Sequence, residues 1–217
     1  LESKLQDKPH LLSSIQRLQS QCTVVAAFQE EPRGLGHAVG CGEDAVGTEP
    51  FAVMLPDDLV FDEVPALQRL IDVYNATGKG VVLLMEVPRE QTQRYGVVAG
   101  TPQSDGTLLI HDMVEKPAPE DAPSNWAIVG RYVFPAGFCE RIRNTKPGAL
   151  NEIQLTDAMR ALAQDEGIIG VPLTGDRIDT GSPNGLFHAS LYLAARNPEL
   201  RAIIDGVLAD SPAITSD

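Results

Sequence analysis

Short runs of apolar residues alternate along the chain with stretches in which apolar residues recur at helical spacing. The runs at residues 23–28 (TVVAAF), 51–55 (FAVML) and 80–87 (GVVLLMEV) are continuous, which is typical of strands buried on both faces of a sheet. Apolar positions over residues 64–75 predict an amphipathic helix between the last two runs. This order predicts an α/β domain with parallel strands, in which ligands bind beyond the carboxyl ends of the strands.

The middle of the chain predicts antiparallel pairing as well. Residues 95–99 (YGVVA) and 108–114 (LLIHDMV) flank the turn sequence of residues 104–106 (SDG), which predicts a hairpin, and residues 127–134 (AIVGRYVF) predict one more strand. We therefore expect a mixed, mostly parallel sheet that is flanked by helices.

Helix signals lie at both ends of the chain. The leucine-rich opening predicts a helix in two pieces, broken by Pro9. Asn151 with Gln154 resembles a capping box, and Ser182 followed by Pro183 predicts the start of another helix.

Composition narrows the function. The chain has 217 residues, 43% hydrophobic and 22% charged, which is ordinary for a globular protein. We expect one domain over residues 1–217, in which residues 199–217 form a C-terminal helix and a mobile tail. The formal net charge of -13 argues against a nucleic-acid partner, because binding a polyphosphate needs a basic surface. No apolar run of 18 residues and no signal peptide occur, so we expect a cytoplasmic protein with no membrane partner.

Carboxylates follow one of the predicted buried strands. Asp57 and Asp58 come directly after the strand at residues 51–55, at the end where ligands bind. Mg²⁺ takes one or two protein carboxylates while substrate phosphates complete its shell, and Asp179, after another strand pattern, could reach the same ion. Both aspartates also fit a simpler role, because aspartate is favoured in turns and near helix N-termini without any metal.

A second cluster of polar residues ends another predicted strand. Glu115 and Lys116 precede Pro117, and they could bind the hydroxyls and the phosphate of a sugar phosphate, although a solvated strand end fits equally well. Gly96 and Gly130 lie inside strand patterns, so each indicates a bulge or the close approach of a ligand to the backbone.

Residues 29–40 (QEEPRGLGHAVG) place two glycines one residue apart ahead of a helical turn. Such turns often receive a phosphate or a base. Gly34-Leu35-Gly36 lacks the third glycine of a dinucleotide fingerprint and the lysine of a P-loop, so by itself it identifies no nucleotide.

Taken in order, these motifs resemble the bacterial UTP:glucose-1-phosphate uridylyltransferases. The resemblance runs from about residue 1 to residue 208 and is carried by QEEPRGLGHAV (29–39), LPDD (55–58), RYGVV (94–98), VEKP (114–117), PSNWAIVGRYVF (123–134), GALNEIQLTD (148–157) and DTG (179–181). GLGHAV, NWAIVGRYV and EIQLTDA are not shared in this form by the wider superfamily of sugar-1-phosphate nucleotidylyltransferases. The resemblance implies a Rossmann-like nucleotide-diphospho-sugar transferase fold.

The resemblance also implies an activity and roles for single residues. The enzyme would form UDP-glucose and pyrophosphate from UTP and glucose 1-phosphate with Mg²⁺ as cofactor. A phosphate oxygen of the sugar would attack the α-phosphorus of UTP in line, without a protein nucleophile. Gln29 and the turn Gly34-Leu35-Gly36 would read the uracil and ribose, with glycines because side chains would block close approach.

On the catalytic and sugar side, Asp57 would bind Mg²⁺, joined by Asp179. Lys116 would meet the phosphate attached to the sugar, so Asp57 and Lys116 would act in catalysis by positioning and by neutralising charge. The residues that would line the glucose pocket are Asp58, Gly96, Glu115, Lys116, Gly130 and Glu152.

One element of the family does not occur in these 217 residues. The glycine-rich GxGTRxxPxxK loop and the PKxM stretch that follows it, which would wrap the triphosphate, are not found, and Leu1 falls inside an apparent helical pattern. We therefore expect residues missing upstream, through an incomplete record, a truncated form or a natural fragment. The 217 residues alone would then lack part of the active site.

Two other functions stay open. The chain could be a nucleotidylyltransferase that uses dTTP or another sugar 1-phosphate, or a non-catalytic subunit that binds a sugar nucleotide. The resemblance further implies a homodimer or homotetramer, in which the C-terminal helices could pair between subunits.

Overall fold

The computed structural model of this protein describes residues 4–148 and 151–210. A six-stranded sheet lies at the centre of its fold. The strands lie in the order β1-β6-β3-β7-β5-β4, and their bounds are β1 (Phe51–Met54), β3 (Gly80–Glu86), β4 (Gly96–Pro102), β5 (Leu108–Glu115), β6 (Trp126–Phe134) and β7 (Ile168–Pro172). Two further strands, β2 (Asp58–Phe61) and β8 (Asp176–Asp179), pair with each other in a small antiparallel sheet. The predicted α/β class and the mixed sheet are confirmed.

Strand direction differs from the mostly parallel sheet that was expected. Among the described strands only β3 and β7 are parallel neighbours, and the other pairs are antiparallel. The strands β1, β3, β4 and β7 nevertheless point the same way, because β6 is inserted between β1 and β3, and β5 between β7 and β4. A continuous apolar run encodes burial on both faces but not strand direction, so the pattern could not show these insertions.

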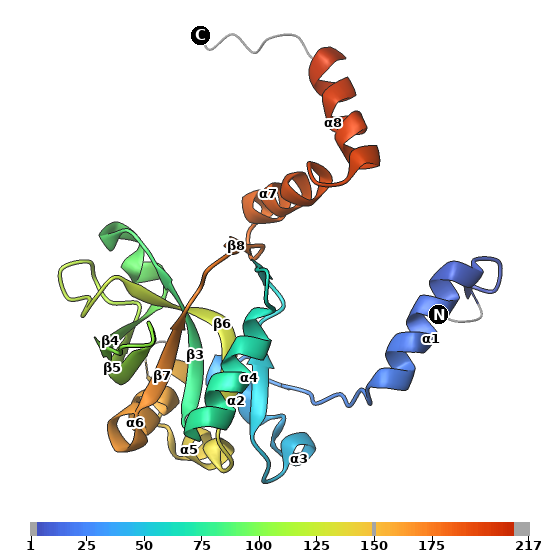
Figure 1. The fold of residues 1–217 in the computed structure, drawn as a ribbon. Coiled ribbons are helices and arrows are strands. Elements are labelled where there is room, and N and C mark those ends of the chain that lie inside the picture. The colour runs from blue at the N-terminus through green and yellow to red at the C-terminus, as the bar shows by residue number, and fades with distance from the viewer. Residues whose placement is uncertain (1–3, 149–150, 211–217) are drawn as a thin grey trace.

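Helices cover both faces of the sheet, as Figure 1 shows. On one face Leu84 of the central strand β3 packs in a core cluster with α5 (Phe138–Asn144) and α6 (Leu155–Glu166). On the other face Leu83 lies in a second cluster beneath α4 (Ala66–Thr77). Successive side chains of a strand point to opposite faces, so β3 must be apolar throughout to fill both layers.

The prediction of a buried strand at residues 23–28 is wrong. This segment is extended and exposed, and it connects α1 (Pro9–Gln21) to α2 (Leu35–Gly40) outside the sheet, as Figure 1 shows. Val24 and Phe28 are 84% and 83% exposed. An apolar run becomes a buried strand only where neighbouring strands accept its backbone hydrogen bonds, and none in the described part of the chain does.

Helix starts were predicted with mixed success. Pro9 begins α1, because the first helical turn does not use the N–H that proline lacks. The predicted helical piece before Pro9 lies partly outside the described residues. Ser182 caps α7 (Pro183–Ala194) as predicted, since its side chain accepts the N–H of Gly185 at 3.1 Å.

The predicted capping box before α6 is not formed. The helix begins at Leu155 without a side-chain cap, and Asn151 has a left-handed backbone with φ of 59°. The side chain of Gln154 donates instead to the carboxylate of Glu152 at 2.9 Å. Gln154 is therefore used to hold the segment before the helix rather than the helix end itself.

Two arms leave the body of the molecule in Figure 1. One is α1, and the other is α7 followed by α8 (Pro198–Asp210), which begins within a residue of the predicted last helix. The predicted mobile tail falls mainly on residues 211–217, which lie outside the described residues. Two further short helices in the described part of the chain are α3 (Glu43–Val46) and the 3₁₀-helix η2 (Arg89–Arg94). No helix within the described ranges is long and apolar enough to cross a membrane.

Candidate active site

A pocket of about 370 Å³ lies where the ends of β1, β5 and β8 meet the start of β4 and the middle of β6. Most of the residues that the sequence singled out line this pocket, namely Leu35, Asp57, Asp58, Gly96, Glu115, Lys116, Gly130, Glu152 and Asp179. Gln29, Gly34 and Gly36 do not line it. The structure thus gathers residues that are spread over much of the sequence into one hollow.

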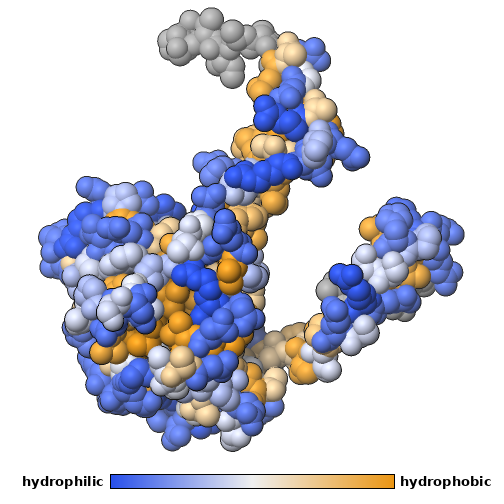
Figure 2. Space-filling view, in the orientation of Figure 1, coloured by the Kyte–Doolittle hydropathy of each residue, from blue (hydrophilic) through white to orange (hydrophobic). Residues whose placement is uncertain are grey.

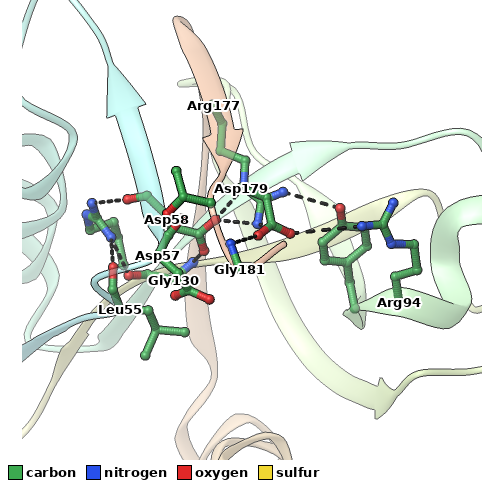
Figure 3. Close-up of polar contacts among 11 residues, drawn as sticks. Leu55, Asp57, Asp58, Arg94, Gly130, Arg177, Asp179 and Gly181 are labelled. Atoms are coloured by element: carbon green, nitrogen blue, oxygen red, sulfur yellow. Dashed lines mark hydrogen bonds and ion pairs between the residues drawn. The ribbon is translucent and has the colours of Figure 1, made fainter. Parts of the chain in front are cut away.

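The turn after β1 leads into β2 rather than into a helix, and two residues, Arg131 and Thr180, bind its backbone (Figure 3). Arg131 donates to the carbonyl oxygens of Leu55 at 3.0 Å and of Asp58 at 2.5 Å. Thr180, just after β8, donates its N–H and its hydroxyl to the carbonyl oxygen of Asp57 at 2.7 and 2.9 Å. These bonds tie the end of β8 to the turn and leave the side chain of Asp57 exposed.

Asp57 and Asp179 flank Gly181. A Cβ at Gly181 would stand 3.0 Å from Oδ2 of Asp57 and 3.1 Å from Oδ1 of Asp179, and this Oδ1 also accepts the N–H of Gly181 at 2.9 Å. The two carboxylates that were predicted to share a metal ion are therefore close together, and glycine leaves the space between them open.

This donor set fits Mg²⁺ that shares its shell with a substrate. Carboxylate oxygens are hard ligands, and Mg²⁺ commonly takes only one or two of them and fills the other positions with phosphates and waters. Within the described residues no group of three or more His, Cys, Asp or Glu side chains could hold a metal ion, so no site that is complete from protein ligands alone is indicated there.

Asp58 lies deeper in the protein and is only 5% exposed. Its Oδ2 accepts the N–H of Gly130 at 2.8 Å, and its Oδ1 accepts the Nε–H of Arg177 at 2.5 Å. Gly130 belongs to a bulge of β6, because the pairing with β3 shifts register between Val82 and Leu83. A Cβ at Gly130 would stand 2.6 Å from Oδ2 of Asp58, so this glycine admits the aspartate.

The other end of the pocket is built around Glu115, the last residue of β5. Its Oε2 accepts the hydroxyl of Thr156 at 2.6 Å, and its Oε1 lies 3.5 Å from Nζ of Lys116. Gly96 pairs with Glu115 across the hairpin, outside the register shift of β4, and a Cβ there would crowd Thr156 at 3.1 Å. Glycine at this position therefore leaves the carboxylate accessible from the pocket.

Lys116 has an unusual backbone. Its φ of 46° is left-handed, which costs a non-glycine residue about 1 kcal/mol or more, and such residues cluster at functional sites. Its side chain is 60% exposed, so the ammonium can reach a ligand in the pocket. Strain at a charged strand end supports a functional reading of Lys116 over that of a merely solvated end.

Some residues of the pocket were not predicted. They include Arg94, Tyr95, Tyr132, Gln154, Thr156 and Arg177. Burial, reinforced by the charges of Asp58 and Glu115, raises the pKa of the Tyr132 hydroxyl, which keeps it protonated and able to donate a hydrogen bond. Apart from Arg177, which lies in none of the quoted motifs, the only sequence signal for these residues was their place inside those motifs, because none has a diagnostic spacing of its own.

The need for glycine at positions 34 and 36 comes from contacts within the protein. A Cβ at Gly34 or at Gly36 would stand 2.7 Å from the carbonyl oxygen of Ile153, and the N–H of Gly36 donates to this oxygen at 2.9 Å. The N–H of Ile153 in turn donates to the carbonyl oxygen of Arg33 at 2.8 Å. The close approach that requires glycine is therefore that of the segment around Ile153, and Leu35 between the glycines lines the pocket.

Gln29 supports this turn from the other side. Its side-chain amide donates to the carbonyl oxygen of Gly34 at 3.1 Å and lies 2.9 Å from Nδ1 of His37. Glu152, which was predicted for the sugar side, lines the pocket together with Gln154. Of the predicted nucleotide-side residues, Leu35 therefore lines the pocket, while Gln29, Gly34 and Gly36 contact the turn and its neighbours without lining the pocket.

The pocket combines five carboxylates with three cationic side chains, at strand ends of an α/β sheet. The carboxylates are Asp57, Asp58, Glu115, Glu152 and Asp179, and the cations are Arg94, Lys116 and Arg177. A polar, charged pocket at strand ends of an α/β sheet is typical of proteins that bind a small polar ligand.

Comparison with known proteins gives the family. The chain belongs to the nucleotidyl transferase family, whose model matches residues 3–196. It is 39% identical to the UTP–glucose-1-phosphate uridylyltransferase YngB of Bacillus subtilis, over 97% of this chain and 71% of that protein. It is 41% identical to a UTP–glucose-1-phosphate uridylyltransferase of Pseudomonas aeruginosa, over 86% of this chain and 67% of that protein.

Solved structures agree with the sequence relatives. A UDP-glucose pyrophosphorylase complexed with UDP-glucose has a TM-score of 0.82 at 39% identity, covering 88% of this chain and 73% of that one. The UTP-bound UGPase from Acinetobacter baumannii has a TM-score of 0.82 at 33% identity, covering 97% and 75%. The resemblance seen in the motifs is confirmed, and this chain is a homologue of bacterial UTP–glucose-1-phosphate uridylyltransferases.

Proposed function

We propose that this protein forms UDP-glucose and pyrophosphate from UTP and glucose 1-phosphate. The observation that carries the proposal is that one pocket gathers Asp57, Glu115, Lys116 and Asp179 from the ends of different strands, in a chain about 40% identical to uridylyltransferases. The pocket also offers carboxylates and a protonated tyrosine, Tyr132, which suit sugar hydroxyls.

In the proposed reaction a phosphate oxygen of glucose 1-phosphate attacks the α-phosphorus of UTP. The bond between this phosphorus and the bridging oxygen breaks, and pyrophosphate leaves with the electron pair. Asp57 and Asp179 would hold Mg²⁺, which when bound neutralises charge on the phosphates. Lys116 would bind the phosphate of the sugar, while Asp58, Gly96, Glu115, Gly130 and Glu152 would shape the glucose site.

For the nucleotide, we propose that Leu35 contacts the base and that Gln29, Gly34 and Gly36 hold Leu35 in place. This assignment is supported by the contacts of the turn, since Gln29 binds the carbonyl of Gly34 and both glycines pack on Ile153. The turn is thereby pre-shaped before any nucleotide binds, which lowers the entropic cost of binding.

The test is pyrophosphate release from UTP and glucose 1-phosphate in the presence of Mg²⁺, measured on the 217-residue chain and on a chain extended upstream to its natural start codon. We expect release by the extended chain, with dTTP or other sugar 1-phosphates giving at least about tenfold lower kcat/KM. Higher rates with dTTP would favour the rival nucleotide. If neither chain releases pyrophosphate and UDP-glucose still binds in calorimetry, the protein is better described as a non-catalytic binding subunit.

We also infer that a second copy of the chain covers the arm of α7 and α8. Figure 2 shows apolar side chains gathered along this arm. The exposed apolar residues are Leu186, Phe187, Leu191 and Leu193 on α7 and Leu200, Ile203, Val207 and Leu208 on α8. Helix α7 contains no Asp, Glu, Lys or Arg, so two copies that each carry a net charge of -13 can pack against α7 without like-charge contacts from this helix.

Sedimentation velocity tests this inference. We expect the unsubstituted chain to sediment as a homodimer or homotetramer, and Ile203→Asp to raise the dissociation constant at least about tenfold, because it buries a charge in an apolar contact. Ala209→Asp adds the same charge to another side of α8 and should have little effect. A monomer at all concentrations would contradict the inference.

A further inference from the structure

Arg177 lines the pocket and contacts two of its aspartates, Asp58 and Asp179 (Figure 3). Its side chain is 10% exposed. Nε and Nη2 bind the carboxylate of Asp58, and Nη2 also lies 3.4 Å from Oδ2 of Asp179. Nη1 donates to the hydroxyl of Tyr95 at 3.2 Å, and the guanidinium lies 5.5 Å from the centre of the Tyr95 ring. All three guanidinium nitrogens are therefore engaged by protein groups.

Arg94 also points at the carboxylate of Asp179, but its surroundings differ from those of Arg177 (Figure 3). It lies 4.0 Å from Oδ2 of Asp179 and is 60% exposed, so it remains available to an incoming anion. Arg177 has no such freedom. The two arginines near Asp179 thus differ in role, one open to the ligand and one committed to the protein.

We propose that Arg177 is a positioning residue that links Asp58 to Asp179 and so holds Asp179 beside Asp57. Asp58 and Asp179 are direct partners in the antiparallel pair β2–β8, and Arg177 lies two residues before Asp179 on the same face of β8. A two-stranded sheet of four-residue strands has little stability of its own. The ion pairs of Arg177 therefore fix the strand that carries Asp179.

The shape of the guanidinium matters as well as its charge. A planar fork binds Asp58 through two nitrogens while it reaches Asp179 and Tyr95, whereas an ammonium can supply charge at only one point. A lysine at this position would keep the charge balance of the buried Asp58 and lose the link to Asp179. Arg177→Lys therefore tests the positioning of Asp179 separately from the neutralisation of Asp58.

This inference rests on the proposed function, and its test includes a readout that does not need turnover. Arg177→Lys would be introduced into the extended chain, and Mn²⁺ binding in the presence of UDP-glucose would be followed by electron paramagnetic resonance, beside kcat and the KM for glucose 1-phosphate. We expect a Mn²⁺ dissociation constant raised about 10- to 100-fold and a kcat lowered by a similar factor, because Asp179 loses its orientation.

The matched control is Arg69→Lys. Arg69 forms an ion pair with Asp62 at 3.0 Å and donates to the carbonyl oxygen of Pro172, outside the pocket. Arg69→Lys should change the free energy of unfolding about as much as Arg177→Lys does, while leaving Mn²⁺ binding unchanged. Arg177→Met, which removes the charge as well, should lose Mn²⁺ binding or fail to fold.

Each outcome decides between positioning and a structural role. Unchanged Mn²⁺ affinity and kcat in Arg177→Lys would overturn the proposal, as would an unsubstituted chain that binds no Mn²⁺. Equal loss of Mn²⁺ affinity in Arg69→Lys would show a general effect of stability and would overturn it too. Weaker Mn²⁺ binding in Arg177→Lys alone, in a chain that releases no pyrophosphate, would support positioning by Arg177 while the proposed reaction fails.

Discussion

Replacing Asp57 by asparagine is expected to lower turnover of UTP and glucose 1-phosphate at least about 100-fold while the fold stays intact. Asparagine keeps the shape of the side chain and removes its negative charge and one oxygen ligand. The structural bonds at this position use the carbonyl oxygen of Asp57, which accepts from Thr180, and the substitution leaves them in place. Because the side chain is exposed, no packing is lost.

The measurement is pyrophosphate release by the extended chain, with circular dichroism and a urea titration to check folding. Asp72→Asn is a suitable control, because Asp72 is an exposed carboxylate on α4 that lies outside the pocket. We expect its turnover to match that of the unsubstituted chain. Normal turnover in Asp57→Asn would remove Asp57 from the metal site.

Asp58 would not serve the same purpose. Its carboxylate is buried and accepts hydrogen bonds from Gly130 and Arg177, so asparagine there would place an amide donor among existing donors. A loss of activity in such a variant would combine chemistry with misfolding. The two adjacent aspartates therefore differ in what their substitution can show, and only the exposed one isolates the chemistry.

Replacing Gly36 by alanine is expected to destabilise the chain by about 1–3 kcal/mol. Alanine normally stabilises a helix relative to glycine by about 0.5–1 kcal/mol, so the expected sign is opposite to the local propensity. The cause is the added Cβ, which would stand 2.7 Å from the carbonyl oxygen of Ile153 and 3.1 Å from the backbone of Gln154. The turn and the segment before α6 would have to separate.

Gly206→Ala provides the matched control for this prediction. Gly206 lies within α8 and has nothing within 4 Å of the position of a Cβ, so alanine should leave stability unchanged or raise it slightly. Urea unfolding of the 217-residue chain measures both variants. If Gly36→Ala keeps the free energy of unfolding and loses only affinity for UTP, the glycine serves the nucleotide directly.

A large part of the fold could be predicted from the sequence. The strands near residues 51–55, 80–87 and 127–134 occur within a few residues of the predicted places, as does the hairpin of β4 and β5. These elements are defined by local patterns of burial and by turn residues, which a chain carries wherever it folds.

Part of the site could be predicted as well. Asp57 stands beyond a strand end because the apolar run before it stops there, and the carboxyl ends of parallel strands meet at the ligand side of an α/β sheet. Glu115 also ends an apolar run, but its strand β5 is antiparallel to β4 and β7, so only the tertiary structure brings it to the same pocket. Arg177, Tyr95 and Tyr132 could not be found this way. Their importance comes from contacts with residues far along the chain, such as Asp58, which lies 119 positions from Arg177.

By itself the sequence determined the family, the α/β class, most of the element boundaries and the residue types that reach the pocket. Only the tertiary structure decided which strands are neighbours, that residues 23–28 lie exposed, and that the glycines near Leu35 make room for Ile153. The physical reason is that local patterns specify conformation and the need for burial. The partner that satisfies this need is chosen by contacts between distant segments, which no local pattern encodes.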